Sequence, residues 1–136
     1  PEKIEKQVSL IENENDIILC SGFLIDENDN RMRYKSKLIK GRFNGRELFF
    51  EFIKGYSLNG LGFLIPKKVF NKAGKFDESM RYLQDLDLWL RIMHFDYIFV
   101  CQDEMLVKGR VHINQTTNKH SELFDKDRER IPKKWR

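Results

Sequence analysis

The sequence has few cysteines, no long apolar run and only a small excess of charge, and each of these absences excludes a class of protein. The two cysteines, Cys20 and Cys101, each lie inside an apolar run, so neither a disulfide framework nor a cysteine-based zinc site is indicated. They are expected to be buried thiols in a reducing compartment. No apolar run approaches the roughly eighteen residues of a membrane span, and no signal peptide opens the chain. A net charge of +4, from 25 Lys and Arg against 21 Asp and Glu, is too evenly mixed to require nucleic acid as a partner.

The residues that are present indicate one globular domain. A length of 136 residues fits a single domain, and a hydrophobic content of 40% with eleven Phe is enough to build a packed core. No internal repeat and no low-complexity segment occurs. Because the chain begins at Pro1 rather than at Met, we expect it to be a piece of a longer protein.

Hydrophobic periodicity predicts helices and strands that alternate along the chain, which is typical of the α/β class. Helices are expected at residues 1–13, 45–53, 67–73 and 86–93 and in a charged tail from residue 121, and strands at residues 17–25, 60–66, 97–101 and 105–111. Residues 35–44 are basic and are expected to be irregular. Residues 26–30 (DENDN) are rich in oxygen ligands, but Arg31 and Lys37 occupy positions where a calcium loop needs Gly and Glu, so a turn is predicted there.

Two of the predicted helices have a clear apolar face. In the first, Ile4, Val8 and Ile11 share one side and Glu and Lys the other, so a surface helix is predicted. In the helix at 45–53, the buried side is expected to carry Leu48, Phe49, Phe52 and Ile53.

The stretch from Gly74 to Met93 joins a helix stop, an acidic turn and a strongly amphipathic helix. Four apolar residues recur there at i, i+3, i+4 and i+7: Leu86, Trp89, Leu90 and Met93. Asp85 is therefore predicted at or just before the first turn, where free backbone N–H groups and the positive end of the helix dipole can hold its carboxylate. This position suits a catalytic base and equally suits an ordinary helix cap. Trp89 is expected to belong to the core rather than to form a sugar platform.

Several segments, read in order, resemble the second half of a family 2 glycosyltransferase of the inverting GT-A type. Residues 1–8 (PEKIEKQV) resemble the helix that follows the DxD metal motif of the family, residues 63–79 its P-x-x-x-F-x-x-x-G-x-F-D-E stretch, residues 84–91 (QDLDLWLR) its E-D-x-D-L-W-L-R helix, and residues 107–112 (VKGRVH) its terminal Y-R-x-H. The run from 70 to 91 is the most specific part. Gln84 replaces the usual Glu, and Gly109 replaces the usual aromatic residue.

The resemblance implies a partial GT-A fold, with helices packed on a small mixed sheet. Residues 1–117 would form the acceptor-side half of the catalytic domain and residues 118–136 a charged helical tail, best interpreted as a solvated helix, with docking to an acidic partner or a membrane surface as the alternative. The nucleotide-binding half, with its DxD, would lie outside this chain. The implied reaction transfers a sugar, with inversion, from a nucleotide-sugar donor to a hydroxyl of a glycan or lipid-linked acceptor, in the synthesis of cell-surface polysaccharide or other glycans.

The resemblance also assigns site residues. Asp85 would be the general base that takes the proton of the acceptor hydroxyl. Gln84 and Arg110, which lie in the matched segments, would contact substrate. Independently of the resemblance, Gly60 and Gly62 let another backbone or a ligand approach closely and are therefore also expected to contact substrate. The two glycines could instead serve tight packing, and Arg110 could be a solvated arginine at a strand end rather than a phosphate ligand.

By the same resemblance, His112 would help to hold a divalent metal, Mg or Mn, on the leaving diphosphate of the parent enzyme. Without the resemblance, a lone histidine is more often a structural hydrogen-bonding residue, because a metal site needs several ligands close in space. The 136-residue chain alone is expected to bind no metal.

We expect the isolated chain to be inactive, because leaving-group binding would reside in the other half. Its strand edges, normally covered by that half, are expected to drive formation of a homodimer. A cytoplasmic location is expected, with peripheral attachment at the inner face of the membrane as an alternative. The competing interpretation of the whole chain is a non-catalytic interaction domain that has kept the fold and lost the donor site.

Overall fold

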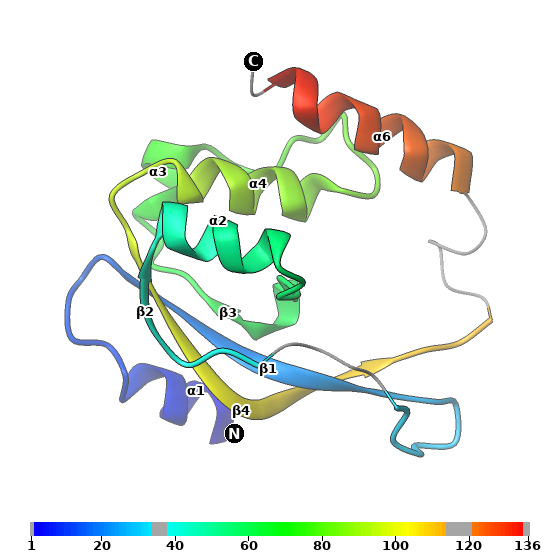
Figure 1. The fold of residues 1–136 in the computed structure, drawn as a ribbon, viewed down its shortest axis with the longest axis horizontal. Coiled ribbons are helices and arrows are strands. Elements are labelled where there is room, and N and C mark those ends of the chain that lie inside the picture. The colour runs from blue at the N-terminus through cyan, green and yellow to red at the C-terminus, as the bar shows by residue number, and fades with distance from the viewer. Residues whose placement is uncertain (1, 34–37, 114–120, 135–136) are drawn as a thin grey trace.

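The computed structural model describes residues 2–33, 38–113 and 121–134. Its elements are α1 (Glu2–Val8), β1 (Asp16–Ile25), β2 (Gly41–Asn44), α2 (Gly45–Ile53), a 3-10 turn (Gly60–Gly62), β3 (Phe63–Leu64), α3 (Val69–Ala73), α4 (Gln84–Met93), β4 (Ile98–Arg110) and α6 (Ser121–Lys134). The strands form one sheet in the order β2-β4-β1-β3. Helices α2, α3 and α4 lie on one face of this sheet, α1 lies on the other, and α6 lies beyond α4 (Figure 1). The predicted α/β class, with helices on a small mixed sheet, is confirmed and is consistent with part of a nucleotide-sugar transferase fold.

The two central strands, β1 and β4, run parallel to each other over their whole length. The sequence predicted two strands where β4 is one, since the polar residues Asp103 and Glu104 interrupt the apolar pattern. The structure accommodates them in a bulge, where the register shifts from Cys20 opposite Gln102 to Ser21 opposite Met105. Strands β2 and β3 pair antiparallel to β4 and β1, respectively.

The core lies between the sheet and the helices α2 and α4. Its fully buried members include Ile17 of β1, Phe99 of β4, Leu48 of α2, and Leu88 and Ile92 of α4. Each such side chain contributes about 1.5–3 kcal/mol relative to an exposed position. Of the predicted face of α4, Trp89 and Met93 are buried in the core, whereas Leu86 and Leu90 are only partly buried. The buried face is therefore rotated toward Leu88 and Ile92.

Helix α2 has the predicted bounds but not the predicted buried face. Leu48 is fully buried, whereas Phe49 is 39% and Ile53 is 62% exposed, so their predicted burial is wrong. The start of the helix closely approaches the end of α4, since a Cβ on Gly45 would lie only 1.8 Å from the carbonyl oxygen of Met93.

Helix α1 is on the surface, as predicted, but a polar residue attaches it to the sheet. Gln7 is fully buried, and its Nε2 donates to the carbonyl oxygen of Gly62 at 2.7 Å. Ile4 and Val8 face outward and are 52% and 51% exposed. The helix ends at Val8 rather than at residue 13, because the Asp16 carboxylate accepts the N–H groups of residues 12 and 13 and holds them in a turn.

Two predictions about the sheet edges are wrong in detail. Residues 41–44, expected to be irregular, form strand β2, and its last residue, Asn44, begins α2 through a reciprocal capping pair with Glu47. The strand expected at 60–66 is reduced to Phe63–Leu64, because Gly60–Gly62 form a 3-10 turn. The turn at 26–30 is confirmed, with the Asp26 carboxylate accepting the N–H groups of Asn28 and Asn30.

The buried thiols are as predicted from the sequence. Cys20 and Cys101 are both free and buried, on the neighbouring strands β1 and β4. Burial raises the pKa of Cys101 to about 12, although a hydrogen bond with Tyr56 acts in the opposite direction. Burial likewise raises the pKa of the Cys20 thiol. In the described part of the chain, no helix has the length and apolar character needed to cross a bilayer.

Candidate active site

A pocket of about 330 Å³ lies where the start of α4 faces the sheet and the loop before β3. Its lining comes from four separate segments, namely residues 22–24 of β1, residues 57–61, Asp85 of α4, and residues 109–110 of β4. Three predicted site residues, Gly60, Asp85 and Arg110, are therefore brought together from positions far apart in the sequence. Of the other predicted site residues, Gln84, Gly62 and His112 lie outside this lining.

Asp85 is the second residue of α4, inside the first turn. Helix α4 has Leu83 at its N-cap position, with no side-chain cap bond, so Asp85 is not the cap that the sequence allowed as its alternative role. Its Oδ1 accepts the backbone N–H of Leu86 at 2.8 Å. The other oxygen, Oδ2, lies 3.7 Å from the point where a Cβ on Gly60 would be. One oxygen is thus anchored at the positive end of the helix, while the other faces the pocket wall.

The two glycines have different roles. Gly60 lines the pocket, and a Cβ there would be at ordinary contact distance from Asp85 and Trp89, so its lack of a side chain leaves space beside the carboxylate. A Cβ on Gly62 would lie 2.4 Å from the carbonyl oxygen of Cys20. Gly62 therefore serves the close packing that the sequence left open as its alternative.

Gln84 and Trp89 place buried polar atoms next to the pocket. Trp89 is 4% exposed, as expected for a core residue, and stacks on Phe63 with 4.1 Å between ring centroids. Its Nε1 and the Oε1 of Gln84 are buried without a hydrogen-bond partner in the described part of the chain. Nothing in the sequence pattern singled out the indole N–H, because its helical spacing is that of a core residue.

Arg110 lines the pocket but also holds the turn at 26–30. Its Nη1 donates to the carbonyl oxygen of Asp26 at 2.9 Å, and its Nη2 lies 2.7 Å from Asp29 Oδ1. The guanidinium thus already makes protein contacts that a phosphate would have to share or displace. Among the residues that line the pocket, Ser57 and Asn59 were missed from the sequence, since isolated polar residues in a loop give no signal.

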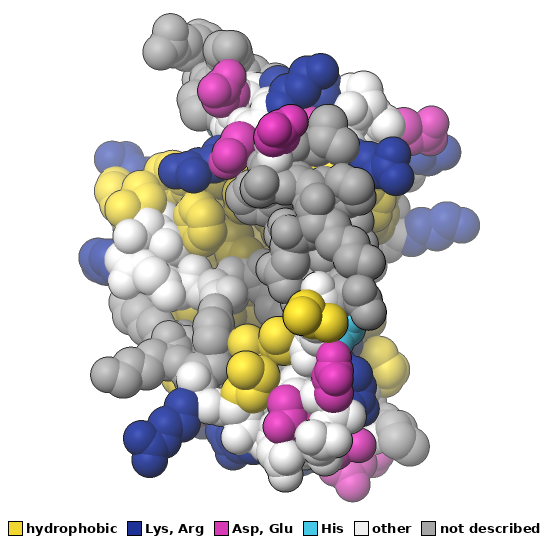
Figure 2. All heavy atoms as spheres, turned by 90° about the vertical axis from the view of Figure 1, so that its right-hand side faces the viewer, with side chains coloured by type: hydrophobic (Ala, Val, Ile, Leu, Met, Phe, Trp, Pro, Cys, Tyr) yellow, Lys and Arg dark blue, Asp and Glu magenta, His cyan; other side chains and the backbone are white. Residues whose placement is uncertain are grey.

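His112 lies in a different pocket, of about 350 Å³, with Asp26, Glu27 and Asn28. Figure 2 shows this face, where acidic, hydrophobic and histidine side chains gather in the lower part and charges of both signs cover the upper part. Within residues 2–33, 38–113 and 121–134, no group of three or more His, Cys, Asp or Glu is placed to hold a metal ion. The described residues alone therefore do not form a complete metal site.

A larger apolar groove, of about 820 Å³, runs along α4 between α2 and α6. Its apolar wall consists of Phe49, Phe52, Leu86, Leu90, Met93, Phe95 and Ile131. Residues from the first and last turns of α4 line it, so it extends along the helix that carries Asp85. This groove explains why the apolar face predicted from Leu86 and Leu90 is only half-buried.

Comparison with known proteins finds relatives that are named uncharacterized glycosyltransferases. The chain is 36% identical over 129 residues to one from Rickettsia typhi and to one from Rickettsia prowazekii, and each match covers 87% of this chain and 38% of the relative. It is 33% identical over 113 residues to one from Methanocaldococcus jannaschii, covering 82% of this chain and 38% of the relative. No protein-family model matches the chain, and no solved structure does so with significance. The chain spans well under half the length of these relatives and is homologous to a segment of proteins named as glycosyltransferases.

Proposed function

We propose that this chain is the acceptor-side part of a glycosyltransferase of the inverting GT-A type, similar to family 2. The observation that carries the proposal is the position of Asp85, whose carboxylate lies in the first turn of α4 beside the open space over Gly60. The similarity to proteins named as glycosyltransferases supports the reaction class. Nucleotide binding would reside outside this chain, and the acceptor would be a glycan or lipid-linked sugar of a surface polysaccharide.

The proposed chemistry is a single displacement. The acceptor hydroxyl lies over Gly60, and Asp85 takes its proton as the new bond forms between the acceptor oxygen and the anomeric carbon. Attack comes from the face opposite the leaving group, so the bond from the anomeric carbon to the diphosphate oxygen breaks and the nucleoside diphosphate departs. Because Oδ1 accepts the Leu86 N–H, the orientation of the carboxylate is restrained. A restrained base spends more time in the geometry that proton transfer requires.

Replacing Asp85 tests this proposal in the full-length protein that contains the chain. The variant Asp85→Asn should lower kcat by at least about a hundredfold, the scale of general-base catalysis, with donor binding little changed. Asp103→Asn is a matched control, since that exposed carboxylate lies outside all three pockets. Wild-type turnover in Asp85→Asn would remove Asp85 from the mechanism, whereas the absence of turnover in the wild-type protein would favour the non-catalytic interpretation.

We further propose that His112 supplies one ligand to a divalent metal, Mg or Mn, in the full-length protein. The described residues do not complete such a site, so the remaining ligands would come from the diphosphate and from segments outside this chain, and no step is derived through the metal. The neighbouring carboxylates Asp26 and Glu27 are oxygen donors of the type these metals prefer.

His112→Ala in the full-length protein should weaken metal-dependent binding of nucleoside diphosphate and leave binding measured in a chelator unchanged. Isothermal titration calorimetry with and without Mg²⁺ or Mn²⁺ measures both. His94→Ala is the control, because that histidine lines the apolar groove instead. Equal metal-dependent affinities for wild type and His112→Ala would contradict the assignment.

We also propose a cytoplasmic location. Two free, buried thiols fit a compartment in which cysteines stay reduced.

A further inference from the structure

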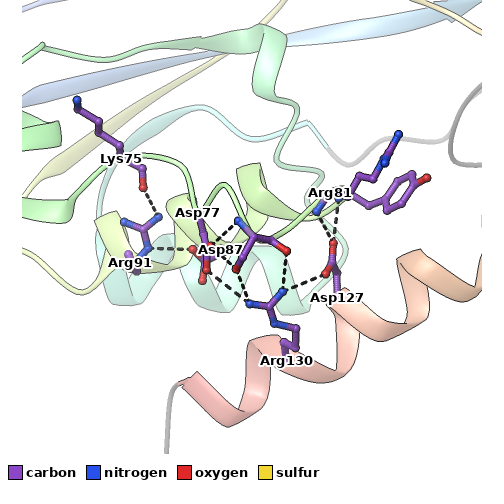
Figure 3. Close-up of polar contacts among 9 residues, drawn as sticks. Lys75, Asp77, Arg81, Asp87, Arg91, Asp127 and Arg130 are labelled. Atoms are coloured by element: carbon purple, nitrogen blue, oxygen red, sulfur yellow. Dashed lines mark hydrogen bonds and ion pairs between the residues drawn. The ribbon is translucent and has the colours of Figure 1, made fainter.

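The loop between α3 and α4, residues 74–83, has no regular secondary structure. It leads directly into α4, the helix that carries Asp85. At its far end, α6 holds it through one carboxylate. Asp127 is 5% exposed, and its Oδ2 accepts the backbone N–H of Arg81 at 2.8 Å and of Tyr82 at 3.0 Å (Figure 3). These two N–H groups lie directly before Leu83, the N-cap residue of α4.

Arg130, one turn further along α6, holds the middle of the same loop. Its Nη1 donates to the carbonyl oxygen of Ser79 at 3.0 Å and its Nη2 to Ser79 Oγ at 2.7 Å. The guanidinium also lies 3.5 Å from Asp127 Oδ1 and 3.8 Å from Asp77 Oδ2. Asp77 in turn accepts the N–H and the hydroxyl of Ser79.

The opposite end of the loop is held by α4 itself. Arg91 pairs with the fully buried Asp87 at 3.0 Å, and it donates to the carbonyl oxygens of Ala73 and Lys75. Since Asp87 is buried, the pair fixes the start of the loop from the inner side of α4. Figure 3 shows the loop with Arg91 on one side and Asp127 and Arg130 on the other.

The first turn of α4, which carries Asp85, has no capping side chain from its own N-cap residue. The N-cap residue Leu83 makes no side-chain bond to the start of α4, so no capping side chain fixes the entry angle of the chain. Asp127 acts from a distant helix instead, because a buried carboxylate that accepts two backbone N–H groups makes strong, charge-assisted bonds. Asp85 is only three residues beyond Tyr82.

We propose that Asp127 and Arg130 are positioning residues for Asp85, and that α6 is a clamp on the loop that leads to it. The inference rests on the proposed function, since it assigns a role toward the same carboxylate. It also adds to the prediction of a solvated helical tail, since most described side chains of α6 are exposed but Asp127 is buried and bonds to the loop. Without the clamp the fold persists, but the first turn of α4 and its carboxylate lose their fixed position.

The test uses the full-length protein, with Asp127→Ala as the variant and Glu129→Ala as the control on an exposed position of α6. Asp127→Ala should lower kcat by about tenfold or more with an unchanged donor KM, since a displacement of about 1 Å can cost that much or more. Asp127→Asn, which keeps an acceptor oxygen for the two N–H groups, should recover most of the rate. Glu129→Ala should behave as wild type.

Amide hydrogen exchange measured on the same proteins separates the clamp from the reaction. The N–H groups of Arg81 and Tyr82 should exchange faster in Asp127→Ala and not in Glu129→Ala. Fast exchange with wild-type kcat would overturn the positioning role, and unchanged exchange would overturn the clamp. If Asp127→Ala does not fold, Arg130→Gln serves, with faster exchange and lower kcat expected. A wild-type protein that transfers no sugar would overturn the proposed function and the positioning role with it, while exchange still decides the clamp.

Discussion

Asp16 is the residue at which three segments of the chain meet. It is 1% exposed, its Oδ1 lies 2.7 Å from Arg42 Nη2, and its Oδ2 accepts the N–H groups of Glu12 and Asn13. Burial by itself raises the pKa of this carboxyl, but Arg42 and the two N–H groups outweigh it, and the pKa lies below its ordinary value of 3.8. Asp16 thus ties the end of α1 and strand β2 to the start of β1.

Because of this carboxylate, the stability of the chain should decrease at low pH. Because its folded pKa is depressed, its contribution is present above the unfolded pKa of about 3.9 and is lost as the pH falls through the lower folded pKa. Asp16→Asn should therefore lower the free energy of unfolding at pH 6 by about 1–3 kcal/mol. The difference from wild type should shrink as the pH approaches 3.

Urea unfolding between pH 6 and pH 3 measures both effects. Asp103→Asn, at an exposed position that lies 3.8 Å from Lys40, is the control and should change stability by only a few tenths of a kcal/mol. A constant difference between Asp16→Asn and wild type across this range would mean that the charge of Asp16 does not contribute.

At the residue scale, the sequence predicted the position of residues that belong to a recognisable motif. It did not predict which polar side chains are buried. The run around Asp85 placed that residue at the start of a helix, and the structure puts it beside Gly60 in a pocket. Gln7 gave no such signal, because a glutamine among Glu and Lys reads as solvent-facing. Only the carbonyl of Gly62, 55 residues away, explains its burial.

At the element scale, helices were predictable, but their partners were not. The bounds of α2 follow from its apolar pattern and its final turn, yet periodicity shows only that a face is apolar, not what covers it. Phe49 was assigned to the core and instead lines an open groove. Strand β2 was missed because four residues in a basic segment carry no period, and its pairing with β4 decides its conformation.

Helix α6 shows the same limit for charged segments. Its composition predicted a solvated helix, and most of its described side chains are exposed. The pair at Asp127 and Arg130 is indistinguishable from its neighbours in the sequence, since Lys, Arg, Asp and Glu fill the whole stretch. Only their contacts with a loop more than forty residues earlier in the chain distinguish Asp127 and Arg130 from the other charged residues of α6.

At the scale of the whole molecule, the described surface exposes more apolar side chains than a compact monomer needs. Ile4 and Val8 of α1 and Phe50 and Ile53 of α2 are each about half exposed or more. Strand β1 lies between β4 and β3 but pairs with β3 only at Ile18 and Leu19, and β3 pairs on one side only within the described residues. Edges and apolar faces of this kind favour pairing with another chain.

We propose that the isolated 136-residue chain forms a twofold dimer through α1, because a symmetric contact covers the same apolar stripe on both copies. Light scattering over a concentration series should show a dimer. The double change Ile4→Ser with Val8→Ser should shift it to monomer, whereas Ile113→Ser, at a residue outside α1 that is 81% exposed, should not. A monomer at every concentration would contradict this proposal.

The reactivity of the two buried cysteines can report when the folded protein opens. A thiol reacts as its thiolate, and with a pKa near 12 and almost no exposure, Cys101 offers alkylating agents and oxidants neither a thiolate nor a path. Cys20, on the adjacent strand, is also buried, and burial raises the pKa of its thiol, but it points to the opposite face of the sheet and lies outside the core cluster. Cys101 belongs to the core between the sheet and the helices α2 and α4, so its thiol becomes available only when that core opens. A covalent adduct on Cys101 therefore marks a copy of the protein whose core has opened at least once, and the rate at which such adducts accumulate reports how often that happens.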